Sequence, residues 1–172
     1  MKSVLAVAAY LGATASALAN WDFVERDGYS QAVVASGRHS FAIGCRPGLF
    51  PERNYALLHT PDRPSPRDLR RINLANPRVS FFLVGRPIGV FEARAIQWIE
   101  NRLSYRVTPN RTLFDAIYGT GGPLHVRVSL DLTDPERTPF IEEEIAEDVT
   151  FPAAGASEAV QAAAKACSHG EP

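Results

Sequence analysis

The sequence predicts a mainly β, α+β fold: one antiparallel, sandwich-like domain with a short helix docked at its C-terminal end. Three observations support this. Short runs of β-branched and aromatic residues recur along the chain, turn signals separate them, and the last stretch reads as a helix. The chain has 172 residues, the length of one domain, and its 45% apolar and 22% charged residues are typical of globular proteins.

Residues 1–19 are predicted to be a secretory signal peptide that precedes a single domain at 20–172. Met1-Lys2 gives a charged start, an apolar run follows, and Ala17-Leu18-Ala19 matches a cleavage site. The alternative is a membrane anchor, but the apolar run is shorter than the roughly 20 residues that span a bilayer. We therefore expect a periplasmic or secreted protein with no stable membrane span after cleavage.

The first part of the domain is expected to be a meander of short strands. Residues 20–26 alternate, which places Trp21 and Phe23 inward, and Asp27-Gly28 is a hairpin turn signal. Further strands are predicted at 29–36, 40–45 and 54–60, the second of these with Phe41, Ile43 and Cys45 on one face.

Residues 60–77 form a Pro-rich stretch that interrupts this rhythm. We expect a loop inside the domain, since neither side of the stretch holds a complete sheet. Ser65-Pro66-Arg67-Asp68 has the spacing of a capping box with proline at the first helical position, which predicts one short helix.

Strands are expected to resume at residue 79. Residues 88–99 fit a helix or a strand, and their β-preferring composition favours a strand. Leu103, Tyr105 and Val107 alternate with polar residues, which indicates a half-exposed strand. The remaining expected elements are a strand at 79–84, a short helix at 112–118, a strand at 124–132, and an acidic segment at 142–148 that leads into a strand at 149–151.

The chain is expected to end in an Ala-rich helix followed by a loose tail at 168–172. Ser157 is a candidate N-cap, and alanine is the strongest helix former. The spacing of Val160, Ala163, Ala164 and Cys167 places them on one face, which we expect to dock on the sheet.

The chain has two cysteines, Cys45 and Cys167, and export permits a disulfide between them. In the simple chain-entropy model such a bridge removes about 4–5 kcal/mol of unfolded-state entropy. The alternative is a pair of free thiols.

Charge divides unevenly along the domain. Residues 20–107 contain 13 arginines and 8 acidic residues, whereas residues 108–172 contain 4 basic and 11 acidic residues. A dipolar surface of this kind can steer a charged partner. We favour the simpler interpretation that the two halves face each other or expose different faces to water. No basic run is long enough to predict nucleic-acid binding, and the stretch at 67–71 is short.

Several features together resemble a known group of proteins. Trp21 lies close to the expected mature start, a strand ends in Cys45, and Gly85-Arg86-Pro87 joins two strands. Leu-Phe-Asp-Ala-Ile-Tyr-Gly stands at 113–119, and Phe-Pro-Ala-Ala-Gly-Ala-Ser-Glu-Ala-Val at 151–160 precedes a final Ala-Cys. The combination resembles small exported bacterial proteins of the invasion-associated locus B type and related periplasmic proteins found with type VI secretion. The resemblance implies a β-rich periplasmic domain without known catalysis.

The sequence contains no recognisable catalytic or metal motif. Gly-x-Ser-x-Gly, His-Glu-x-x-His and Cys-x-x-Cys are all missing, so no catalytic residue, metal site or cofactor is predicted. We therefore expect a non-enzymatic binding or structural module of the bacterial envelope that contacts another envelope or secreted protein. Trp98 and Tyr105 are the candidate partner surface.

Two alternatives remain open. One is a small hydrolase with a site among His39, His59 and nearby acids, which requires a histidine within reach of both a hydroxyl and a carboxylate. The other is an inhibitor or immunity-type partner of an envelope enzyme, with 60–77 as its protruding loop.

Overall fold

The computed structural model describes residues 20–26, 28–46, 54–98, 101–120, 122–131 and 143–168. The expected signal peptide and residues 169–172 lie outside them. The described elements are β1 (Asp22–Arg26), β2 (Tyr29–Ser36), β3 (His39–Cys45), β4 (Asn54–His59), α1 (Pro66–Leu74), β5 (Arg78–Leu83), β6 (Arg86–Gln97), β7 (Leu103–Val107), α2 (Arg111–Thr120), β8 (Leu124–Asp131), β9 (Glu143–Phe151) and α3 (Ala156–Ser168).

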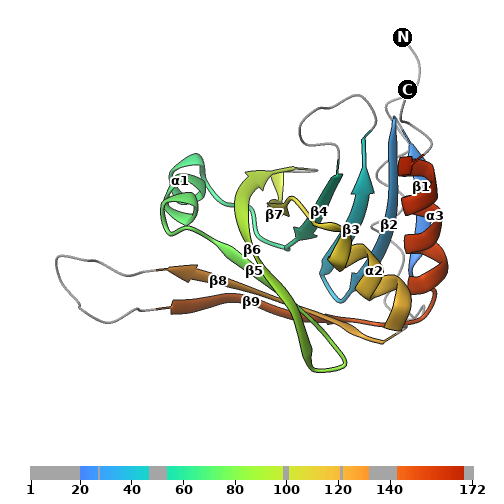
Figure 1. The fold of residues 1–172 in the computed structure, drawn as a ribbon. Helices are drawn as coiled ribbons and strands as arrows, with labels where there is room; N and C mark the ends of the chain where they lie inside the picture. Colours follow the sequence, from blue (N-terminus) through green and yellow to red (C-terminus); the bar gives the residue numbers. More distant parts are fainter. Residues whose placement is uncertain are drawn as a thin grey trace, which may run out of the picture.

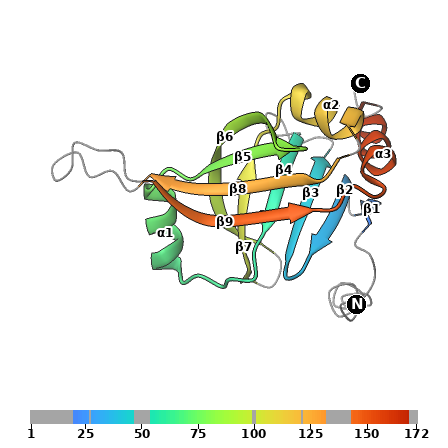
Figure 2. The same cartoon turned by 90° about the horizontal axis from the view of Figure 1, so that it is seen from below.

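The nine strands that the structure describes belong to one antiparallel sheet, in the order β1-β2-β3-β4-β7-β6-β5-β8-β9 (Figure 1). The long strand β6 pairs with β5 over its first half and with β7 over its second half. The sheet bends back on itself, so β5, β8 and β9 pass over β2, β3 and β4 (Figure 2). The predicted β-rich, sandwich-like α+β fold is confirmed.

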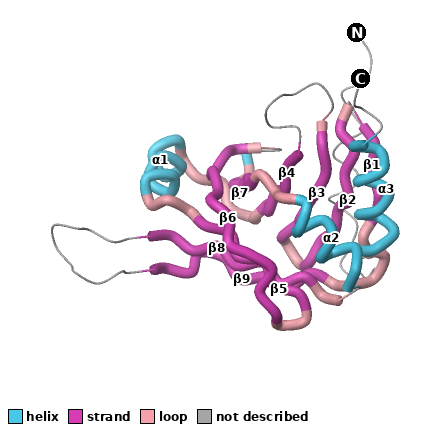
Figure 3. The backbone as a smooth tube through the Cα atoms, viewed as in Figure 1, coloured by secondary structure: helices cyan, strands magenta, loops and turns pink. Residues whose placement is uncertain are grey.

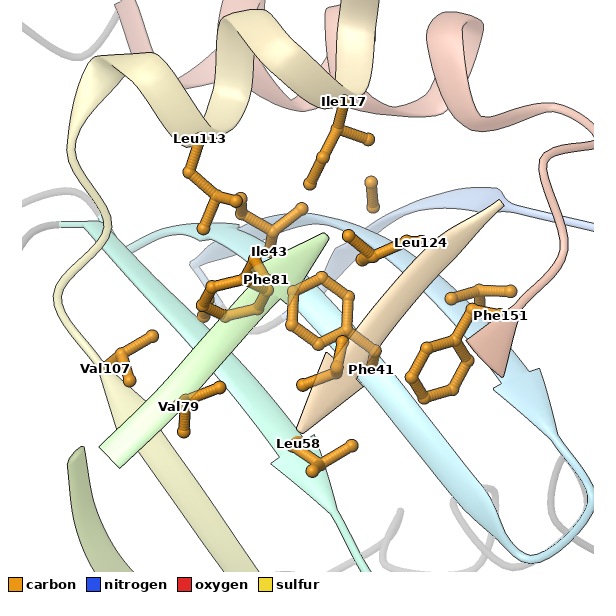
Figure 4. Close-up of a cluster of buried hydrophobic side chains, with 14 of the residues drawn as sticks. Phe41, Ile43, Leu58, Val79, Phe81, Val107, Leu113, Ile117, Leu124 and Phe151 are labelled. Carbon is orange, nitrogen blue, oxygen red and sulfur yellow. The ribbon is translucent and has the colours of Figure 1, made fainter. Parts of the chain in front are cut away.

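The core lies between these layers, and α2 and α3 cover the rest of the inner face (Figure 3). Phe41 contacts Phe81 and Phe151 with ring centroids 5.8 and 5.9 Å apart. Leu113 and Ile117 of α2 are buried and point toward this cluster (Figure 4). Each fully buried large apolar side chain contributes about 1.5–3 kcal/mol, so this cluster is the main source of stability.

Two helix predictions have different outcomes. Ser65 caps α1, and its hydroxyl accepts a hydrogen bond from the Asp68 backbone N–H at 3.2 Å, as predicted. The N-cap prediction for Ser157 is wrong, because α3 already begins at Ala156 and the Ser157 hydroxyl donates to the Tyr118 carbonyl.

The buried face of α3 differs from the predicted one. Ala156, Ala159, Val160 and Ala163 share the helical spacing and are buried, whereas Ala164 is exposed. Val160 and Ala163 belong to both the predicted and the observed face, and Ala164 is the residue that the prediction misplaced. The predicted bridge is nevertheless confirmed: Cys45 and Cys167 are joined, with their Cα atoms 5.7 Å apart across 122 positions of sequence.

Three further predictions differ in how well they agree with the structure. The ambiguous segment at 88–99 is a strand, as favoured. Phe23 lies opposite the buried Ala32 and so faces the inner side, as predicted, but it is 38% exposed because β1 is at the edge of the sheet. The described part of the acidic segment, 143–148, does not precede the strand but forms the first six of the nine residues of β9, paired with β8.

Candidate functional site

The two residues expected to form a partner surface lie in different environments. Trp98 is 40% exposed just after β6. Tyr105 is 2% exposed, so its assignment to an exposed surface is wrong. It lies opposite Leu58 of β4, and both side chains are part of the core on the inner face. The apolar side of β7, with Leu103 and Val107, is buried as its alternation indicates, but the strand is not half-exposed, because Ser104 on the other side is 0% exposed.

A polar cluster lies where β9 crosses the start of β3. His39 Nε2 and Glu147 Oε2 are 2.9 Å apart, with side chains that are 24% and 12% exposed. Burial raises the pKa of Glu147, and the His39 hydrogen bond partly offsets this effect. Burial, with the nearby carboxylates of Glu147 and Asp62, also raises the pKa of Tyr105. These residues connect the two layers of the bent sheet.

The second histidine of this region, His59, lies on the other face of the same strands. His59 Nδ1 is 2.7 Å from the hydroxyl of Ser104, which is fully buried. Burial, assisted by the positive charge of Arg102, lowers the pKa of His59 from 6.5 to about 4. His59 is therefore neutral at pH 7, and one of its two ring nitrogens is committed to the serine.

The hydrolase alternative requires one histidine that is within reach of both a hydroxyl and a carboxylate. Neither His39 nor His59 has both partners. The carboxylate is bound to His39 and the hydroxyl to His59, and strand alternation separates the two rings onto opposite faces of the sheet. A nucleophile needs a base that is itself oriented by a third group. Ser104 is also inaccessible to a substrate, since its exposed fraction is 0%.

An ordered cluster of side chains lies on the outer face of β5, β8 and β9. The Arg127 guanidinium contacts Asp148 Oδ2 at 3.0 Å, and His125 Nε2 bonds the other carboxylate oxygen. The Phe82 ring stacks on His125 at 5.2 Å, and Arg127 lies over the same ring at 5.7 Å. Val90 of β6 is 64% exposed and pairs with Ser80, which in turn pairs with Arg127. We call Phe82, Val90, His125, Arg127 and Asp148 the outer patch.

Hydrogen bonds from His125 and Arg127 lower the pKa of Asp148, so its carboxylate is charged at neutral pH. The register of the strands explains the arrangement, because Phe82 lies opposite His125 and Arg127 lies opposite Asp148. The alternation of the predicted strand at 124–132 indicates that His125 and Arg127 lie on its polar face. It did not find their partners, because Asp148 comes from a strand whose register includes an irregularity between Val128 and Ser129.

Within the described ranges, no group of three or more His, Cys, Asp or Glu side chains is arranged to hold a metal. None of the described helices is both long enough and apolar enough to cross a bilayer.

Comparisons with protein-family models, curated proteins and solved structures gave no match for this chain.

Proposed function

We propose that the protein is a non-enzymatic binding module of the bacterial envelope, exported to the periplasm or beyond and stabilised by the Cys45–Cys167 disulfide. Its contact surface is the outer patch, together with Trp98 as a separate exposed aromatic residue. The observation that carries the proposal is the order of the patch: its charged and aromatic side chains already hold one another in place.

A preordered patch of this composition suits protein binding. Aromatic residues and arginine are enriched among the residues that dominate binding energy at interfaces. Because Arg127 and His125 are fixed by Asp148 and Phe82, a partner loses little side-chain entropy when it binds them. The surrounding apolar side chain, Val90, adds area that a partner can remove from water.

Support for export comes from the sequence and the bridge together. Disulfides persist in oxidising compartments and are rare in the cytosol of mesophiles. The N-terminal segment has the pattern of a signal peptide, and the two cysteines of the chain are paired with each other.

The compartment is tested by the intact mass of the protein recovered from the periplasm or culture medium. We expect a chain that begins at Asn20, lacks two hydrogens, and gains two alkyl groups only after reduction. A chain that retains residues 1–19, or two thiols that alkylate without reductant, would contradict the proposal.

The contact surface is tested by crosslinking in intact cells, followed by mass spectrometry of the adducts. We expect one partner protein to be captured by the parent chain. Arg127→Ala should reduce its yield several-fold. Arg111→Ala is the matched control, because Arg111 is 92% exposed on α2 and its removal leaves the outer patch intact. Equal yields from the two variants would show that the patch is not the contact surface.

A second candidate, an inhibitor of an envelope enzyme, is favoured by the position of α1. This helix has no buried residue and lies at the opposite side of the molecule from α3 (Figure 1). Asn73 anchors it to β6 by bonding both the N–H and the C=O of Ala95, and Leu74 is 72% exposed. For this candidate, Leu74→Asp should abolish partner capture while Arg127→Ala should not.

A further inference from the structure

We infer that the outward face of α1 docks on the surface of a bilayer that contains anionic phospholipids. The inference goes beyond the proposed function and does not depend on the outer patch. It follows from three arginines and one exposed leucine that share a face of this helix, and from the way in which the opposite face is held by the domain.

One side of α1 fixes the helix to the domain. Leu69 and Ile72 are half-buried and pack against the core. The Asn73 side chain donates to the Ala95 carbonyl at 2.8 Å and accepts the Ala95 backbone N–H at 2.8 Å. At 3.6 residues per turn, these three side chains of α1 fall within an arc of about 100°. The opposite side of the helix is therefore turned away from the domain.

This opposite side is basic. Arg67, Arg70, Arg71 and Leu74 fall within a second arc of about 100°, and we call them the basic face. All four side chains are exposed, Leu74 to 72%. None of the three arginines forms an ion pair with a residue that the structure describes. The basic face therefore presents three unpaired positive charges around an apolar side chain.

The carboxylates near α1 lie outside the basic face. Asp68 accepts a hydrogen bond from the hydroxyl of the N-cap residue Ser65 at 2.6 Å. With Glu144 of β9, it borders a groove of about 220 Å³ on the flank of the helix, which is lined by Asp68, Arg71, Ile72, Ala75, Leu130 and Glu144. Two carboxylates disfavour an acidic protein segment in this groove. A flat layer of phosphates contacts a convex helix face without a matching groove, which favours a lipid surface over an acidic protein.

The composition of the basic face suits the boundary of a bilayer. Guanidinium groups bind phosphate oxygens in a bidentate manner, and an apolar side chain between them can enter the zone between head groups and acyl chains. Each arginine near an anionic membrane strengthens binding roughly fivefold, so three contribute on the order of a hundredfold. Both views place α1 on the side of the molecule away from α2 and α3 (Figure 1, Figure 2). Docking through α1 therefore leaves these two helices on the side away from the bilayer.

Co-sedimentation of the full chain with lipid vesicles measures the docking. We expect phosphatidylcholine vesicles with about 30% phosphatidylglycerol to bind the chain roughly a hundredfold more tightly than pure phosphatidylcholine vesicles at low salt. Added salt should reduce this preference, because it screens exposed charges. Leu74→Gln should weaken binding several-fold and leave the salt dependence unchanged, since it removes apolar contact and no charge.

Two triple variants separate the basic face from net charge. Glutamine in place of Arg67, Arg70 and Arg71 should remove most of the preference for anionic vesicles, and α1 should persist because arginine and glutamine have similar helix propensities. The control carries the same loss of charge at exposed arginines outside α1 and should stay within about threefold of the parent. Its replaced residues are Arg38, Arg86 and Arg111.

A dye on Leu74→Cys reports whether this position enters the bilayer. The two native cysteines are paired with each other, so the label attaches to the new thiol. We expect the emission of an environment-sensitive dye to shift to the blue on anionic vesicles. Asp115→Cys, at a 66%-exposed position on α2, is the control and should show no shift.

Four results would overturn the inference. They are equal binding of the parent to both kinds of vesicle, equal loss of binding in the two triple variants, a dye at Leu74 that stays in water while the chain binds, and capture of a protein through Leu74 without any vesicle binding. The last result would favour the inhibitor candidate. Arg127→Ala should leave vesicle binding unchanged, so a failure of the outer patch as a contact surface is measured separately.

Discussion

The inner face of β2, β3, β4 and β7 is covered in two different ways. Over Ile43 and Cys45 it is covered by α2 and α3, and the contacts are apolar except for the disulfide. We call this the helix-covered region. Over the start of β3 it is crossed by β9, and the contact is the His39–Glu147 pair. We call the His39–Glu147 pair, together with the His59–Ser104 pair on the opposite face of the sheet, the polar region.

The comparison shows how one sheet can combine a stable part with a pH-sensitive part. Apolar burial is independent of pH, whereas the pKa shifts of buried titratable groups are linked directly to stability. Between the regions lies Trp21, whose indole N–H donates to the Pro152 carbonyl at 2.7 Å and whose ring contacts Phe41 at 5.9 Å. Gly155, with φ of +76°, allows the backbone after β9 to pass close to Trp21.

The largest effect is expected from the disulfide in the helix-covered region. Replacing both Cys45 and Cys167 by alanine should lower the free energy of unfolding by about 4–5 kcal/mol, because the bridge closes a long loop. Urea denaturation of the parent and the double variant measures the difference. A loss below about 1 kcal/mol would mean that packing of α3 alone holds this region together.

The second-largest effect on the free energy of unfolding is expected on acidification, through His59 in the polar region. Its folded-state pKa of about 4 lies below the unfolded value of 6.5. Between pH 6.5 and 4 the unfolded state protonates His59 and the folded state does not, so acid favours unfolding. The contribution of about 3 kcal/mol that is present above pH 6.5 is therefore lost as the pH falls toward 4. His59→Gln removes the titrating group and should flatten the decline in urea stability over that range. His125→Gln is the control, and its urea stability should still decline over that pH range. If the decline were absent from His125→Gln, it would not originate at His59.

A smaller effect is expected at the junction of the two regions. Trp21→Phe keeps an aromatic ring but leaves the half-buried Pro152 carbonyl without its indole donor. We expect a loss of about 1–3 kcal/mol in the free energy of unfolding. Trp98→Phe, at an exposed position, is the matched control and should stay within about 0.5 kcal/mol of the parent. Equal losses in the two variants would contradict the role given to Trp21.

The smallest effect is expected from Glu147. Its pKa is raised in the folded state, chiefly by burial. The sign is therefore opposite to that of His59: the contribution of Glu147 to stability is present at acid pH and is lost as the pH rises through its folded-state pKa. Glu147→Gln should thus reduce the decline in stability between acid and neutral pH. A steeper decline in the variant would show that the His39 pair outweighs burial.

Local patterns in the sequence predict much of the fold. Alternation and turn residues predict the hairpin of β1 and β2, the strand at 88–97 and the inward face of β3, because these depend on neighbouring residues. The even cysteine count predicts the bridge.

Features that depend on contacts between distant strands escaped prediction. Alternation indicates that Ser104 is exposed, but it is 0% exposed and bonded to His59 of the neighbouring strand β4. The outer patch depends on the register of β8 with β9, which an irregularity displaces. The meeting of His39 with Glu147 joins positions 108 residues apart.

Hydrogen exchange of the folded protein at pH 7 and pH 4.5 tests the division into two regions most directly. We expect amides around His59 to lose protection by more than about tenfold on acidification, while amides of Ile43 and Val160 change by less than about threefold. Equal loss of protection in both regions would contradict the account, since it would show that the sheet opens as a single unit.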